Sequence, residues 1–154
     1  MTAADPLEAA FRALLVYGGV GGITVSAYCV AFRSSERSAV YLDPPAPLVA
    51  RLVATQANLH SASECPLARG GRLEGPGRQR VMYLILSDTA TSAGDTVTYT
   101  GSTNCGGTCG VGGEVRVIKR GEVWHSFFRV RWISSVPPNM RLELTPPVVV
   151  ELRL

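Results

Sequence analysis

The C-terminal half of the chain constrains the fold most, because short apolar runs alternate there with turn residues. Val81–Leu86 is continuously apolar, which is typical of a strand buried on both faces. Further strands are predicted at Thr96–Thr100, Glu114–Lys119 and Val123–Ile133, and Arg120-Gly121 suits a tight turn between the last two. Runs of this length and order predict an antiparallel sheet.

The end of the chain contains two more alternating segments, Arg141–Leu144 and Val148–Leu154, which Pro146-Pro147 separates. The last segment is expected to form an edge of the sheet, where unpaired backbone groups can bind a second copy of the chain. Glu151 and Arg153 equally suit a role in preventing such pairing. A homo-oligomer formed through this C-terminal edge strand is therefore one of two expectations.

Two helix starts precede the sheet. Asp5-Pro6-Leu7-Glu8 combines a capping carboxylate, a proline at the first helical position and a glutamate suited to a capping box, and Gly18-Gly19 ends this helix. A strand is predicted at Ile23–Arg33, and Asp43-Pro44 begins a second short helix by the same logic. Asn58–Gln79 is expected to be irregular. The chain thus predicts an α+β fold, with two short N-terminal helices packed on a curved antiparallel meander.

Size and composition suit one domain that spans residues 1–154. Apolar residues make up 46% of the chain and charged residues 18%, which is enough apolar surface for a core. The net charge of +3 is mild, so we expect no nucleic-acid partner. No run is long and apolar enough to cross a bilayer, and the first residues lack the pattern of a signal peptide. The chain is then either cytoplasmic or an exported protein whose leader has been removed.

Four cysteines allow three pairings. Cys105-Gly106-Gly107-Thr108-Cys109 is a loop that can bend to close a small ring, and it suits a structural clip, with free thiols or a redox role as alternatives. A zinc site would need these two cysteines together with His60 and His125, which no spacing brings together. We therefore predict no metal and no cofactor.

Alternation along the longest strand separates two faces. Trp124, Phe128, Val130 and Trp132 fall on one face. The other face, with Arg116 from the neighbouring strand, is a candidate binding face for anions or carboxylates, and its members are Arg116, His125, Phe127, Arg129 and Arg131. The alternative is an ordinary solvated face of a half-buried sheet.

Signals for catalysis are weak, and we expect a protein that is not an enzyme. The chain lacks a G-x-S-x-G elbow and has only two histidines. Asp88, Asp95 and Glu114 are the carboxylates that a meander would have to bring together for hydrolysis. The alternative class is a cystatin-like or NTF2-like protein whose pocket binds or hydrolyses a small ligand.

One ordered set of motifs carries a family resemblance. Tyr28-Cys29, Asp43-Pro44 with Leu48-Val49-Ala50-Arg51-Leu52, Ser63-Glu64-Cys65, Val123-Trp124 and Trp132-Ile133-Ser134 resemble a family of small exported bacterial proteins of unknown function. The resemblance covers about residues 28–134 and implies a periplasmic or secreted α+β domain with a Cys29–Cys65 disulfide. This chain departs from it in the missing leader and in the Cys105–Cys109 loop.

These features together predict an exported, non-catalytic binding or accessory module. Its partner would be a protein or a small anionic ligand. The two alternatives are the pocket protein and a cytoplasmic thiol or metal protein with free cysteines.

Overall fold

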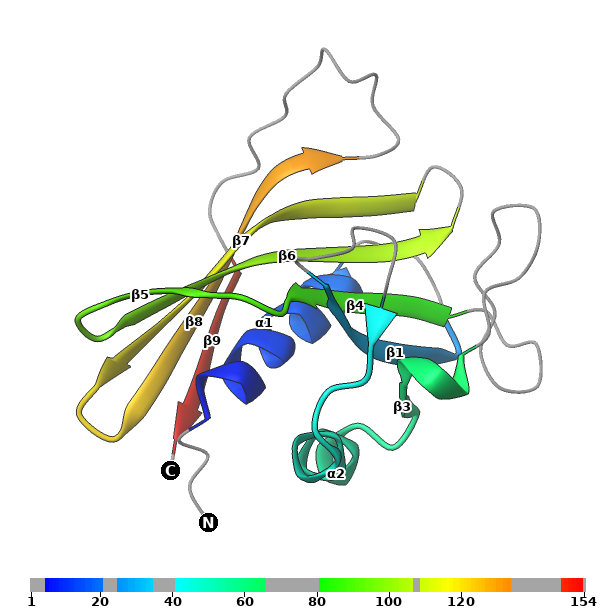
Figure 1. The fold of residues 1–154 in the computed structure, drawn as a ribbon, viewed down its shortest axis with the longest axis horizontal. Coiled ribbons are helices and arrows are strands. Elements are labelled where there is room, and N and C mark those ends of the chain that lie inside the picture. Colours follow the sequence, from blue (N-terminus) through cyan, green and yellow to red (C-terminus); the bar gives the residue numbers. More distant parts are fainter. Residues whose placement is uncertain are drawn as a thin grey trace.

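A computed structural model describes residues 5–20, 25–34, 41–65, 81–106, 109–133 and 148–153 (Figure 1). These residues form two helices, nine strands and a short 3-10 turn. In chain order the elements are α1 (Pro6–Val20), β1 (Ala27–Arg33), β2 (Tyr41–Leu42), α2 (Ala46–Thr55), β3 (Leu59–Ser61), η1 (Ala62–Glu64), β4 (Val81–Ser87), β5 (Thr91–Ala93), β6 (Thr96–Gly106), β7 (Cys109–Arg120), β8 (Val123–Ile133) and β9 (Val148–Arg153).

All the strands belong to one sheet, with the order β2-β1-β4-β6-β7-β8-β9. β3 pairs with β1, and β5 pairs with β6. From β4 to β9 the neighbours in this order are antiparallel, so an α+β fold with a mostly antiparallel sheet is confirmed. The sheet is not antiparallel throughout, because β1 runs parallel to both β3 and β4. The segment that contains α2 therefore acts as a crossover connection.

Several predicted boundaries shift. β3 and η1 form within the segment expected to be irregular. β7 begins at Cys109, five residues before the predicted Glu114. The sequence pattern misses this part of the strand because it is rich in glycine, which is uncommon inside strands. β9 pairs only with β8 among the described strands, as expected of an edge strand. The strand predicted at Arg141–Leu144 lies outside the described residues.

The start of α1 follows its sequence signal. The backbone N–H of Leu7 donates to Asp5 Oδ1 over 3.0 Å, and Pro6 is the first helical residue. The predicted capping box is absent, because Glu8 Oε1 accepts a hydrogen bond from Arg12 Nη2 at 3.2 Å instead. The second cap prediction is also wrong, since α2 begins at Ala46 without a side-chain cap. Asp43 Oδ1 instead accepts a hydrogen bond from the backbone N–H of Ser63 at 2.8 Å.

A charge cluster around the buried Glu8 joins the two helices. Arg51 Nη2 donates to Asp5 Oδ2 over 3.1 Å, and Arg51 Nε lies 3.7 Å from Glu8 Oε1. Arg12 Nη1 donates to Thr55 Oγ1 at 2.6 Å. Glu8 is only 3% exposed, so the two arginines supply the positive charge that a buried carboxylate needs. These charged groups serve to hold α2 against α1.

The main core lies between α1 and the sheet. α1 contacts β4 and β6 through β9, and Figure 1 shows it alongside these strands. Phe11 packs against Phe32 with ring centroids 5.8 Å apart, and Tyr17 meets Phe128 edge to face at 5.1 Å. Phe128 is 1% exposed and Trp124 is 8% exposed, and both belong to this core. These two residues therefore fill the interior, where the pocket hypothesis needed them to line a cavity.

A candidate binding face and the disulfide that flanks it

The strand β8 separates the core from an open outer face. Trp124, Ser126, Phe128 and Val130 are buried, whereas His125, Phe127, Arg129 and Arg131 between them are half-buried or exposed. In the pairing of β7 with β8, Arg116 lies opposite Phe127 and Glu114 lies opposite Arg129. The five residues of the predicted binding face thus share one face of the sheet, opposite the face that contacts α1.

Three of these residues gather around Glu114. Arg116 Nη2 lies 3.5 Å from Glu114 Oε2, and Arg131 Nη2 lies 3.6 Å from the same atom. Arg129 is exposed opposite Glu114, and within the described part of the chain it has no ion pair. We call Arg116, Arg129, Arg131 and Glu114 the arginine cluster. Two guanidinium groups thus lie close to one carboxylate, and a third is exposed opposite it on the neighbouring strand.

The remaining members of the face are arranged around this cluster. Phe127 is half-buried beside Arg116, whereas His125 lies opposite Ile118, two pairs further from Glu114. On the other side, Thr98 of β6 lies opposite Arg116 and Thr100 lies opposite Glu114. Short hydroxyl side chains thus border the arginine cluster on β6, and an aromatic ring borders it on β8.

A β-bulge places Arg131. Val130 pairs with Gly113 and Trp132 pairs with Gly112, so Arg131 is an extra residue in β8. Gly113 permits this irregularity, because a Cβ atom at that position would lie 1.9 Å from the carbonyl oxygen of Arg129. Bulges redirect side chains and often border functional sites. The bulge also interrupts the alternation before Trp132, whose side chain lies outside the described residues.

Sequence reasoning missed the bulge and the position of Glu114. The available signal was Gly112-Gly113 between apolar and charged strand residues, since paired glycines inside a strand often mark a bulge. Glu114 was considered as a partner of Asp88 and Asp95 in hydrolysis. The structure places it among arginines instead, while Asp95 lies at the turn between β5 and β6 and Asp88 follows β4.

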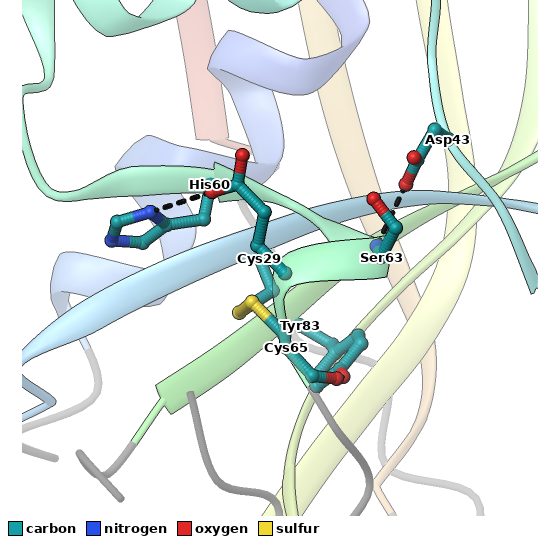
Figure 2. Close-up of a disulfide and its surroundings, with 7 residues drawn as sticks. Cys29, Asp43, His60, Ser63, Cys65 and Tyr83 are labelled. Carbon is teal, nitrogen blue, oxygen red and sulfur yellow. Dashed lines mark hydrogen bonds and ion pairs between the residues drawn. A yellow bond between two sulfur atoms is a disulfide. The ribbon is translucent and has the colours of Figure 1, made fainter. Parts of the chain in front are cut away.

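Figure 2 shows the Cys29–Cys65 disulfide, which joins β1 to the residue that follows η1. Its sulfur atoms are 2.03 Å apart, and the predicted pairing is confirmed. Cys29 is 0% exposed and Cys65 is 3% exposed, in a small second core with alternate residues of β1 and β4, among them Tyr83 and Ile85. Because this core lies on the side of the sheet away from α1, the outer face is covered at β1 and β4 and open at β6 to β8.

Polar contacts hold η1 in place over this second core. The Tyr83 hydroxyl donates to the carbonyl oxygen of Cys65, and His60 Nδ1 lies 3.1 Å from Glu64 Oε2 (Figure 2). Burial raises the pKa of Tyr83, and the nearby Tyr41 adds to the shift, so its hydroxyl stays protonated as a donor at neutral pH. The disulfide and the hydrogen bond from Tyr83 thus have a structural role, because they attach the end of η1 to β1 and β4.

The other cysteines and histidines are placed separately. Cys105 is disulfide-bonded, and the side chain of Cys109 lies outside the described residues. His60 pairs with Glu64 beside η1, whereas His125 lies on β8. In the described ranges no group of three or more histidine, cysteine or acidic side chains has an arrangement that would hold a metal ion.

Comparisons of the chain with family models, with curated proteins and with solved structures find no match. In the part of the chain that the structure describes, no helix is long and apolar enough to cross a membrane.

Proposed function

We propose that this chain is a non-catalytic binding or accessory module that holds a negatively charged partner, a protein or a small anion, on the outer face of β6, β7 and β8. The observation that carries the proposal is the arginine cluster. Its three arginines lie on an exposed or half-buried part of the sheet face, and Glu114 is the carboxylate that lies close to Arg116 and Arg131. Guanidinium groups bind carboxylates and other oxyanions with paired N–H donors, which suits recognition without chemistry.

The fold supports a rigid platform of this kind. Phe128 and Val130 alternate with the arginines of β8 and are almost fully buried. The outward-facing side chains therefore belong to a strand that is fixed by its packing against the core. We infer further that the sheet curves around α1, since α1 contacts its strands from β4 to β9. One face would then be used for the core and the other for the partner.

We place this module in the periplasm or outside the cell of a bacterium. The Cys29–Cys65 pair supports an oxidising compartment, because buried disulfides persist there and are rare in the cytoplasm. The resemblance to a family of small exported bacterial proteins agrees with this location. A cytoplasmic thiol protein would need free cysteines, and no cysteine whose side chain is described is free.

The test is thermal unfolding in the presence of anionic probes. We expect sulfate, citrate or octaglutamate to raise the Tm of the wild-type chain by about 5 °C near saturation, because ligands of the folded state stabilise it. Arg129→Ala should lose most of this increase. Arg120→Ala is the matched control, since Arg120 is exposed at the end of β7 and outside the arginine cluster. An unchanged Tm with every probe, or equal shifts in both variants, would contradict the proposal.

A further inference from the structure

Glu114 forms unusually loose contacts for the centre of an arginine cluster. Its Oε2 atom is shielded from solvent, yet it accepts no hydrogen bond from the described residues. The nitrogen atoms nearest to it belong to Arg116 and Arg131 and lie 3.5 and 3.6 Å away. Hydrogen-bonded arginine–carboxylate pairs are much closer, at about 2.7–2.9 Å. Glu114 therefore holds these arginines electrostatically without using the N–H donors that a bidentate partner would use.

The three arginines also differ in how they interact with Glu114 in the free protein. Arg116 and Arg131 are each close to Glu114, whereas Arg129, directly across the strand pair, has no ion pair within the described residues. The side chains of Arg116 and Glu114 remain 54% and 37% exposed. Ion pairs with this exposure are weak and easily exchanged. An incoming carboxylate can thus meet Arg129 first and then compete with Glu114 for its neighbours.

We propose that Glu114 is an internal competitor that occupies the arginine cluster until an acidic, extended segment of a protein partner displaces it. The inference rests on the proposed function, because it assigns a partner and a regulating residue to the same face. Glu114 partly neutralises the arginines in the free protein, and so it lowers binding of anions that offer too few carboxylates to replace it.

The spacing of the arginines favours an extended peptide over a small anion. Arg129 and Arg131 are two residues apart on one strand, and Arg116 lies on the neighbouring strand. Alternate side chains of an extended chain point to the same side, so a segment with acidic residues at every second position can present several carboxylates to these arginines at once. Phe127, half-buried beside Arg116, supplies apolar contact for the residues that flank the acids.

The test measures fluorescence anisotropy of a labelled (Glu-Thr)4 peptide with the full chain, at low ionic strength and at about 0.15 M salt. We expect Glu114→Gln to bind the peptide about fivefold more tightly than wild type, since it removes the negative charge that competes for Arg116 and Arg131 at nearly constant side-chain volume. Arg129→Ala should bind at least fivefold more weakly. Glu122→Gln is the matched control, because Glu122 is exposed at the turn between β7 and β8 and its loss changes the net charge equally.

Each result has a distinct meaning. Tighter binding by Glu114→Gln, with Glu122→Gln equal to wild type, supports the inference. If Arg129→Ala weakens binding but Glu114→Gln does not strengthen it, the face binds anions and the competitor role is overturned. If sulfate displaces the peptide fully at matched ionic strength, the occupant is a small oxyanion and the peptide assignment is overturned. Absence of binding by wild type and by Glu114→Gln would overturn both the inference and the proposed function.

Discussion

Replacing both Cys29 and Cys65 with alanine is expected to lower the free energy of unfolding by about 4 kcal/mol. The bridge closes a loop with a sequence separation of 36 residues, and the loop-entropy relation gives about 4 kcal/mol for that length. The loss is large because the bridge fixes η1 over the second core, where Cys29 and Cys65 are both buried. Urea unfolding of wild type and the double variant measures the difference.

Reduction of the wild-type chain provides the control for this prediction. Intact mass before and after reduction shows whether the bridges are present. Reduction also breaks the bridge of Cys105, so the reduced wild type should be no more stable than the double variant. A double variant that unfolds at the same urea concentration as the oxidised wild type would contradict the structural role of the bridge. It would also remove the main support for an oxidising compartment.

Gly113→Ala is expected to lower the free energy of unfolding by about 3 kcal/mol and to weaken binding of anionic probes. Its Cβ atom would lie 1.9 Å from the carbonyl oxygen of Arg129 and 2.9 Å from the backbone nitrogen of Arg131. Backbone atoms cannot rotate away, so β8 must move and the bulge that places Arg131 must change. The cost lies at the upper end of the range for overpacked sites.

Gly101→Ala is the matched control, because Gly101 is also a buried strand glycine. Its added Cβ would meet Val115 Cγ2 at 2.7 Å and Leu86 Cδ2 at 3.2 Å, which are side-chain atoms that can adjust. We therefore expect a smaller loss, of about 1 kcal/mol, and normal probe binding. Urea unfolding and the thermal-shift assay measure both properties. Equal destabilisation by the two variants would mean that the bulge does not depend on Gly113.

Local signals in the sequence were enough to find many of the elements. The cap at Asp5 and the apolar run at Val81–Leu86 each depend on neighbouring residues, and the structure contains both. The parallel pairing of β1 with β3 and β4 was not predictable in this way, because it depends on how the segment containing α2 returns to the sheet. Asp43 shows the same limit, since its hydrogen bond to Ser63 joins residues twenty positions apart.

The residues of the candidate face on β8 were predictable from local alternation, but the position of Glu114 among them was not. Alternation along β8 assigns Phe127, Arg129 and Arg131 to one side without any knowledge of the fold. The position of Glu114 among the arginines depends on the register of β7 and β8 and on the bulge at Gly113. Neither can be read from one strand alone, because strand register is set by pairing and by turn geometry.

We expect the outer face of β6 to β8 to be the binding surface, and an NMR titration with (Glu-Thr)4 can locate the residues that the peptide contacts. In ¹H–¹⁵N spectra of the full chain, we predict that the largest shifts on adding the peptide occur at Glu114, Arg116, Phe127 and Arg129. Shifts that instead gather on α1 and α2, or around Cys29 and Cys65, would contradict the claim and place the binding surface elsewhere.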